Sequence, residues 1–145
     1  MDTNVLVAAR VPEASQFQIA RSAMLRAFHG VERLRISRQV LREYLVTVTR
    51  PQVWSAPLGM ADAWKDAERM SRSFEILEDG PHVMAILQEL CRDVRVAGKQ
   101  IHDANIAATM LAYGEQRLLT LNRRDFHRFA DRLELVRVGE SDAGA

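Results

Sequence analysis

Four acidic residues of this chain have the type and placement needed for metal-assisted hydrolysis. They are Asp2, Glu43, Asp103 and Asp125, and each comes near the end of a predicted strand or early in the helix that follows. In open α/β sheets, ligands bind at the carboxyl ends of the strands. Carboxylates gathered there repel one another unless a hard cation neutralises them, and oxygen ligands of this kind select Mg²⁺ or Mn²⁺. The pattern therefore predicts a divalent-metal site suited to cutting a phosphodiester.

Each acid taken singly also has a structural explanation. Asp2 would suit a frayed terminus, Asp103 a helix N-terminus favoured by the macrodipole, and Asp125 an N-cap or first-turn position. Glu43 is the least easily explained, because it lies about six residues into its predicted helix, on the face of Val40. An inward-facing carboxylate needs a partner, so Glu43 carries the most weight.

Arginines cluster beside two of these acids. The candidates for contacts with a nucleic-acid backbone are Arg38, Arg42, Arg123 and Arg124. The formal net charge of +1 shows no general basic excess, so the local distribution matters more than the sum. The alternative interpretation is that these arginines are solvated faces of amphipathic helices.

Other common catalytic patterns do not occur in the sequence. The four histidines have no HxxH or HExxH spacing, and a lone Cys91 excludes both an internal disulfide and a cysteine-based zinc site. No glycine-rich phosphate loop or GxSxG motif is found either. The acidic residues remain the best candidates for chemistry.

The elements that must position these residues alternate between helical and extended patterns, which is typical of an α/β domain with a parallel sheet. We expect one domain over residues 1–139 and a flexible tail over 140–145. Predicted helices cover 12–29, 38–50, 60–70, 82–96 and 103–113, and predicted strands cover 34–36, 74–77, 117–121 and 133–138. A mostly parallel sheet of four or five short strands should result.

Length and composition fit a soluble globular protein. The chain has 145 residues, 48% apolar and 27% charged, which is enough to bury one core without disulfides. It has no apolar run of about 18 residues to span a bilayer, and its N-terminus lacks the pattern of a signal peptide. We therefore expect a cytoplasmic protein with no membrane association.

Four segments, in this order, resemble the PIN domain, and particularly the VapC-type toxins of bacterial toxin–antitoxin pairs. They are DTNVLVAA, SRQVLREYLVTVTRP, IHDANIAATMLAYG and LLTLNRRDF. The resemblance runs over nearly the whole chain, and its specificity lies in the set of motifs and their intervals. It implies a three-layer α/β/α sandwich around a central, mostly parallel sheet.

The resemblance also assigns roles to residues. It implies that Asp2, Glu43 and Asp103 hold Mg²⁺ or Mn²⁺ and that Asn4 and Thr120 orient these ligands. It leaves open whether one metal is bound or two.

The fourth position of the site departs from the family pattern. Many family members have an acid two residues after the threonine, where this chain has Asn122, and Asp125 follows three residues later. The Asn122 carbonyl can accept a metal or a water but carries no charge. We expect Asp125 to be a supporting catalytic residue that acts from outside the direct ligands or through water.

A second departure concerns the residues before Asp2. Members of the family usually have several apolar residues there, forming a central strand, whereas only Met1 precedes Asp2 in this sequence. Either the assigned start of the chain is late or this strand is largely missing. If Met1 is the true terminus, we expect its amino group to lie beside the carboxylates and compete with the metal, and Asp2 to be poorly held.

The resemblance implies a Mg²⁺- or Mn²⁺-dependent endoribonuclease that leaves 5′-phosphate and 3′-hydroxyl ends. Its substrate would be RNA, and its partners would be a cognate antitoxin and a second copy of itself. The alternative is a catalytically weak PIN domain that binds RNA or a protein. A phosphohydrolase acting on small esters is disfavoured because D-T-N lacks the second acid of a D-x-D motif.

Overall fold

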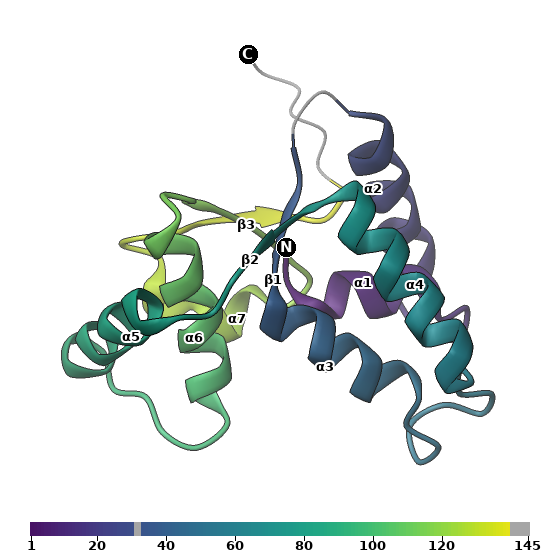
Figure 1. The fold of residues 1–145 in the computed structure, drawn as a ribbon, viewed down its shortest axis with the longest axis horizontal. Helices are drawn as coiled ribbons and strands as arrows, with labels where there is room; N and C mark the ends of the chain where they lie inside the picture. Colours follow the sequence, from purple (N-terminus) through teal and green to yellow (C-terminus); the bar gives the residue numbers. More distant parts are fainter. Residues whose placement is uncertain (31–32, 140–145) are drawn as a thin grey trace.

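The computed structural model describes residues 1–30 and 33–139 of the chain. Helices and short strands alternate along it, as the periodicity predicts (Figure 1). In chain order the elements are α1 (Thr3–Arg10), α2 (Phe17–His29), β1 (Arg35–Ser37), α3 (Arg38–Val48), α4 (Met60–Ser73), β2 (Glu75–Leu77), α5 (Pro81–Asp93), α6 (Gln100–Ala112), β3 (Arg117–Thr120), α7 (Arg123–Phe126), a 3₁₀ turn (His127–Phe129) and β4 (Glu134–Arg137).

The strands lie between two groups of helices. Figure 1 shows α1 to α4 on one side of the strands and α5 and α6 on the other. Helices cover both faces because parallel strands are joined by crossovers that carry a helix back over the sheet. The predicted three-layer α/β/α organisation is confirmed.

The four described strands form two parallel pairs rather than one continuous sheet. β1 pairs with β2, with Ile36 opposite Ile76, and β3 pairs with β4, with Leu118 opposite Leu135. The number of strands and their parallel direction agree with the prediction. The sheet is divided because only the backbone at the start of the chain reaches between the two pairs.

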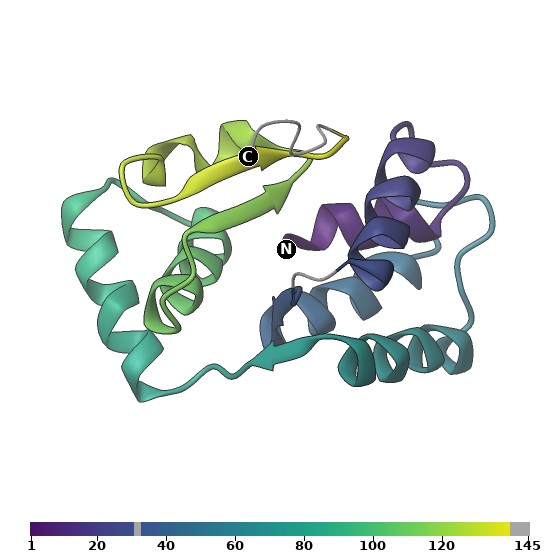
Figure 2. The same ribbon diagram turned by 90° about the horizontal axis from the view of Figure 1, so that it is seen from above.

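Met1 and Asp2 form this link. The Met1 amino group donates a hydrogen bond to the Arg35 carbonyl of β1 at 3.0 Å, and the Asp2 N–H donates to the Leu119 carbonyl of β3 at 3.0 Å. The N-terminus accordingly lies between the two strand pairs when the molecule is seen from above (Figure 2). These two residues occupy the position of a central strand.

Local sequence explains how α3 and α6 begin and pack. Ser37 is the N-cap of α3, and its hydroxyl accepts the Val40 N–H at 3.2 Å, as predicted. In α6 the small residues Ala104, Ala107 and Ala108 are fully buried, which lets this helix pack closely. These two helices carry Glu43 and Asp103, so their packing fixes how far apart the two acids lie.

Other element boundaries differ from the predictions. The predicted helix over 12–29 begins only at Phe17, and the helix predicted over 82–96 ends at Asp93. The helix α1 was not predicted, because the motif D-T-N resembles a strand end more than a helix start. The predicted flexible tail over 140–145 lies outside the described residues.

No helix in the described ranges 1–30 and 33–139 combines the length and the apolar character needed to cross a membrane.

Candidate active site

Asp2 is buried and firmly held at the start of α1. It has extended backbone dihedrals and is 7% exposed, and its carboxylate accepts a hydrogen bond from the Thr120 hydroxyl at 2.7 Å. Its N–H is bonded to β3 as well. The expectation that Asp2 is poorly held is therefore wrong, because hydrogen bonds from the end of β3 replace the support of a longer N-terminal strand.

Burial raises the pKa of the Asp2 carboxyl above its ordinary value of 3.8. The hydrogen bond from Thr120 and the positive charge of the amino terminus act against this rise, while the nearby carboxylate of Glu43 adds to it. Asp2 and Glu43 thus lie near enough to repel each other.

The Met1 amino group is influenced mainly by its burial, which lowers its pKa from 8.0 to about 6. At neutral pH it is therefore mostly uncharged. The nitrogen donates to the Arg35 carbonyl of β1. The sequence led us to expect that a charged ammonium would compete with a metal. Because the amino group is mostly uncharged, this competition is weaker than expected.

Glu43 points inward from α3, as its position in the helix predicts. The Thr3 hydroxyl donates to its Oε2 at 2.7 Å, and the Gln39 amide donates to its Oε1 at 2.6 Å. Both carboxylate oxygens are thus oriented by neighbours. The exposed ring of His102 lies farther away, with its Nδ1 3.9 Å from Oε1 of Glu43.

Gln39 joins Glu43 to α6 and was missed by the sequence reasoning. Its amide donates to the His102 carbonyl at 3.0 Å, and its own oxygen accepts the Asn105 amide at 2.6 Å. The signal that could have found it is the i,i+4 spacing of Gln39 and Glu43 on one helix. The pair holds α3 and α6 in register at the two acids.

Asp103 lies in the first turn of α6 and is half-buried. Burial first, and then the carboxylates of Asp125, Asp2 and Glu43 in that order, raise the pKa of its carboxyl from 3.8 to about 6. The positive charge of Arg128 lowers it in part. The other three acids singled out from the sequence therefore lie within electrostatic reach of Asp103.

The supporting residues form a chain of hydrogen bonds at the end of β3. Asn4 donates to the Thr120 hydroxyl at 3.3 Å and accepts the Leu121 N–H at 3.1 Å. The Thr120 hydroxyl also accepts the Asn122 N–H at 3.0 Å, and the Asn122 amide donates to the Asp125 carboxylate. Asn4 and Thr120 thus orient Asp2, and Asn122 orients Asp125.

The chemistry of the donors fits a hard divalent cation. Within residues 1–30 and 33–139, no three His, Cys, Asp or Glu side chains are arranged to hold an ion as they stand. The other three acids nevertheless add to the rise that burial causes in the pKa of Asp103, and this repulsion is what a bound cation relieves. The side chains would have to draw together around an ion.

The arginines predicted to bind RNA differ in their surroundings. Arg38 forms an ion pair with Glu78 on the surface, whereas Arg42 lines a groove between α3 and α4. Arg123 and Arg124 are exposed in α7, directly after Asn122. The positive charge of Arg128, four residues after Arg124, acts on Asp103, and its guanidinium donates to the Arg95 carbonyl at 3.3 Å.

Comparison with known proteins decides the family. A profile of the PIN domain matches residues 1–132. This chain belongs to the PIN domain family. No curated protein sequence matches it. The PIN domain assignment agrees with the four motifs and with the acids that the fold brings together.

Two solved structures share the fold of this PIN domain. One is VapBC2 from Rickettsia felis bound to a DNA fragment from its promoter, with a TM-score of 0.67 and 21% identity over 94% of this chain and 95% of that chain. The other is DNA-bound VapBC from Salmonella typhimurium, with a TM-score of 0.58 and 23% identity over 94% of each chain. At these identities the likeness shows the fold.

Proposed function

We propose that this PIN domain is a Mg²⁺- or Mn²⁺-dependent endoribonuclease and the toxin of a toxin–antitoxin pair. The observation that carries the proposal is the gathering of Asp125, Asp2 and Glu43 around Asp103, where burial first and then these three charges raise the pKa of Asp103 to about 6. Asp2 precedes α1, Glu43 lies on α3 and Asp103 lies on α6, so the fold brings these acids together. Such clusters are the usual sites of metal-assisted phosphodiester hydrolysis.

The residues of the site have different proposed roles. Asp2, Glu43 and Asp103 are proposed to bind the ion, with Thr120 orienting Asp2 and Gln39 orienting Glu43. When bound, the ion would neutralise the cluster, polarise the phosphate and lower the pKa of an attacking water. Asp103 must lose its proton before it can bind the ion, so the cleavage activity should depend on pH.

A single-stranded or looped RNA is the proposed substrate. Arg123 and Arg124 lie exposed beside Asn122 and Asp125, where they can contact phosphates next to the acids. Unstacked RNA is favoured because the deep groove of an A-form helix does not admit side chains. Arg38 is a weaker candidate, since Glu78 already pairs with it.

The proposal of an antitoxin partner draws support from the VapBC structures and from the surface of α3 and α4. A groove of about 270 Å³ between these helices is lined by Leu41, Leu45 and Trp64 together with three arginines, Arg38, Arg42 and Arg72, and one acid, Glu68. An amphipathic helix with acidic residues on its flanks would match this combination. We propose that the pair acts in the cytoplasm, where its RNA is found.

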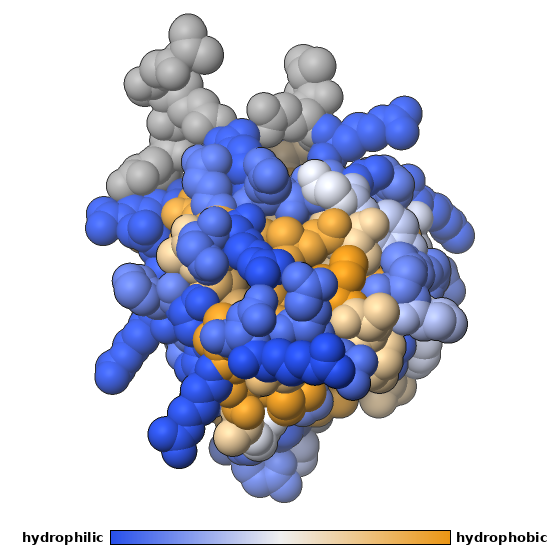
Figure 3. All heavy atoms as spheres, turned by 90° about the vertical axis from the view of Figure 1, so that its left-hand side faces the viewer, coloured by the Kyte–Doolittle hydropathy of each residue, from blue (hydrophilic) through white to orange (hydrophobic). Residues whose placement is uncertain are grey.

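A homodimer is proposed as well. The face that carries α5 shows an apolar area within a hydrophilic surround (Figure 3), and Met84 of α5 is 61% exposed. Light scattering of the purified protein tests this part, and Met84→Asp should shift a dimer towards monomer. A monomer at concentrations of the order of 100 μM would count against it.

The nuclease proposal is tested with a fluorescently labelled RNA and a titration of Mn²⁺. We expect cleavage that requires the ion, is removed by EDTA and falls at least ~100-fold in Asp103→Asn. The matched control is Asp62→Asn, which removes a carboxylate of the same type from the surface of α4, far from the cluster. It should cleave as the wild type does.

The alternative is a catalytically weak PIN domain that binds RNA, and Asn122 at the fourth position favours it. In that case the wild type would retain RNA in a filter-binding assay but produce no fragments with Mn²⁺ or Mg²⁺. Cleavage that is unaffected by Asp103→Asn would instead point to a contaminating nuclease.

A further inference from the structure

The orientation of the Gln39 amide decides which atom faces Glu43. A glutamine side chain ends in a donor nitrogen and an acceptor oxygen of similar size, so its amide can take two opposite orientations. Here the nitrogen donates to Glu43 at 2.6 Å and to the His102 carbonyl at 3.0 Å. The reverse orientation would turn the amide oxygen towards these two acceptors. The observed orientation leaves the oxygen of this buried amide to be satisfied by a donor on its other side.

Asn105 of α6 supplies this donor, and Asp79 decides which end of the Asn105 amide is available. The Asn105 nitrogen donates to the Gln39 oxygen at 2.6 Å and to the Asp79 carboxylate at 3.1 Å. An ionised carboxylate accepts hydrogen bonds but cannot donate them, so Asp79 keeps the nitrogen of Asn105 on this side. The two amides thus form a chain whose direction is set by a carboxylate at each end, Asp79 and Glu43.

The loop that carries Asp79 is held in place, although Asp79 itself is exposed. β2 ends at Leu77, which pairs with Ser37 of β1, so the loop begins at the carboxyl edge of this strand pair. The Tyr113 hydroxyl accepts the Glu78 N–H and donates to the Glu78 carbonyl, each at 3.1 Å. Both backbone groups of the residue before Asp79 are therefore bonded to the end of α6.

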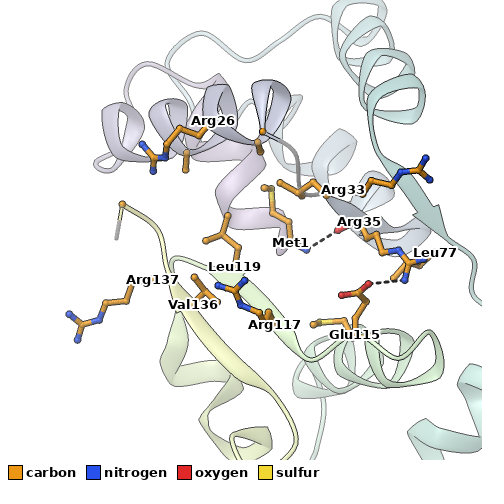
Figure 4. A pocket seen from close by; sticks show the side chains of 16 residues that line it. Met1, Arg26, Arg33, Arg35, Leu77, Glu115, Arg117, Leu119, Val136 and Arg137 are labelled. Atoms are coloured by element: carbon orange, nitrogen blue, oxygen red, sulfur yellow. Dashed lines mark hydrogen bonds and ion pairs between the residues drawn. The ribbon is translucent and has the colours of Figure 1, made fainter. Parts of the chain in front are cut away.

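Arg35 of β1 in turn holds Tyr113. Its guanidinium donates to the Tyr113 carbonyl at 3.4 Å and to Glu115 at 2.7 Å, and the second of these contacts is drawn in Figure 4. Two further nitrogens of the same guanidinium donate to the carboxylate of Glu75 in β2, each at 2.8 Å. β1, β2 and the end of α6 are thus joined next to the loop, which fixes Asp79 relative to Asn105.

We propose that Asp79 and Asn105 are positioning residues, which fix the orientation of the Gln39 amide and through it that of the Glu43 carboxylate. The inference rests on the proposed function, since Glu43 is a proposed ligand of the ion. Asp79 is then a further acid of the site that acts by orienting amides rather than by binding the ion. Neither residue was a sequence candidate, because the chain of contacts joins three elements that are far apart in sequence.

The metal-free protein in EDTA gives the first test, because this measurement does not depend on cleavage. Hydrogen exchange of the side-chain NH₂ protons, followed by NMR of the isotope-labelled chain, should be slow at Gln39 and Asn105. Asp79→Asn should speed the exchange at both residues by about 5-fold or more, the factor that corresponds to one typical hydrogen bond. Asp62→Asn, which changes an exposed acid on α4, should leave both rates unchanged. Equal rates in Asp79→Asn and the wild type would overturn the proposal.

Asn105→Asp separates orientation from charge. It replaces the amide with a carboxylate of the same shape, which repels both Asp79 and the Gln39 oxygen and so reverses the Gln39 amide. Added negative charge alone would strengthen the binding of Mn²⁺. Misorientation of Glu43 should instead weaken it by about 10- to 100-fold in calorimetric titration at about pH 8. Gln88→Glu, which adds the same charge on the exposed face of α5, should leave the affinity close to that of the wild type. Binding by Asn105→Asp that is as tight as in the wild type, or tighter, would contradict the positioning role.

A double variant shows whether Asp79 acts through Gln39. In the Gln39→Leu background, Asp79→Asn should cause little further loss of Mn²⁺ affinity, because the amide that it orients is absent. Losses that add in full would show that the charge of Asp79 acts on the ion directly, and would overturn the proposal. If Asn105→Asp fails to fold, the double variant and the exchange rates still test the role of Asp79. A wild type that binds no Mn²⁺ and cleaves no RNA would refute the proposed function, and the exchange rates would then test the orientation by themselves.

Discussion

Gln39 shows how a residue that performs no chemistry can set the geometry of an acidic site. It is buried at 7% exposure and uses both ends of its amide, one on Glu43 and His102 and the other on Asn105. In metal sites, replacing a residue that orients a ligand typically lowers metal affinity by about 10- to 100-fold.

Replacing this amide tests its role. Gln39→Leu should weaken Mn²⁺ binding and lower the cleavage rate by about 10- to 100-fold, because Glu43 loses one of its two orienting donors. Calorimetric titration with Mn²⁺ gives the affinity directly. Gln88→Leu on the exposed face of α5 is the matched control and should leave affinity unchanged. A Gln39→Leu protein that binds Mn²⁺ as tightly as the wild type would contradict the positioning role.

Asp103 should impose a pH dependence with a defined sign. Its pKa is raised from 3.8 to about 6 on folding, mainly by burial, so the folded state holds the proton more tightly than the unfolded chain. The stability associated with this group is fully present below about pH 4 and is lost as pH rises through about 6.

In EDTA at pH 7.5, we therefore expect Asp103→Asn to melt at a higher temperature than the wild type, with the difference shrinking towards pH 4. Thermal melts across this range measure it. Asp62→Asn removes a surface carboxylate paired with Lys65 and should show no such gain. Cleavage by the wild type should fall as pH drops below about 6, because the protonated Asp103 no longer offers a charged ligand.

At the scale of elements, helix starts place the site. Asp2 precedes α1, Asp103 lies in the first turn of α6, and the cap of α3 fixes where the helix of Glu43 begins. The structure differs from the sequence prediction most clearly at α1, because the motif D-T-N was interpreted as a strand end rather than as a helix start.

The cap at Ser37 gives a test at this scale. Ser37→Ala removes the acceptor of the Val40 N–H at 3.2 Å and should reduce the free energy of unfolding by about 1 kcal/mol. Urea denaturation measures the change. Ser22→Ala, at an exposed position within α2, should leave stability unchanged or raise it slightly, since alanine is the better helix former. An equal loss in both variants would rule out a specific cap.

At the scale of the whole molecule, the proposed ion would connect the two strand pairs. Asp2 is tied to β3, Glu43 lies on α3 and Asp103 on α6, so one ion held by all three would join both strand pairs. Mn²⁺ at 100 times its Kd should add about 2.7 kcal/mol and raise Tm by several degrees. Asp103→Asn should lose most of this rise, and an unchanged Tm for the wild type up to millimolar Mn²⁺ would argue against a bound ion.

The sequence alone determined the four acids, the helices that carry Glu43 and Asp103, the cap at Ser37 and the family, because periodicity, capping and motif spacing are local properties of the chain. The partners of the acids were decided by tertiary packing. The tertiary structure decides three features: the donors that reach the two oxygens of Glu43, the hydrogen bond from Thr120 to Asp2, and the division of the strands into two pairs. All three depend on ångström-scale distances between segments that are far apart in sequence. No local pattern encodes such distances.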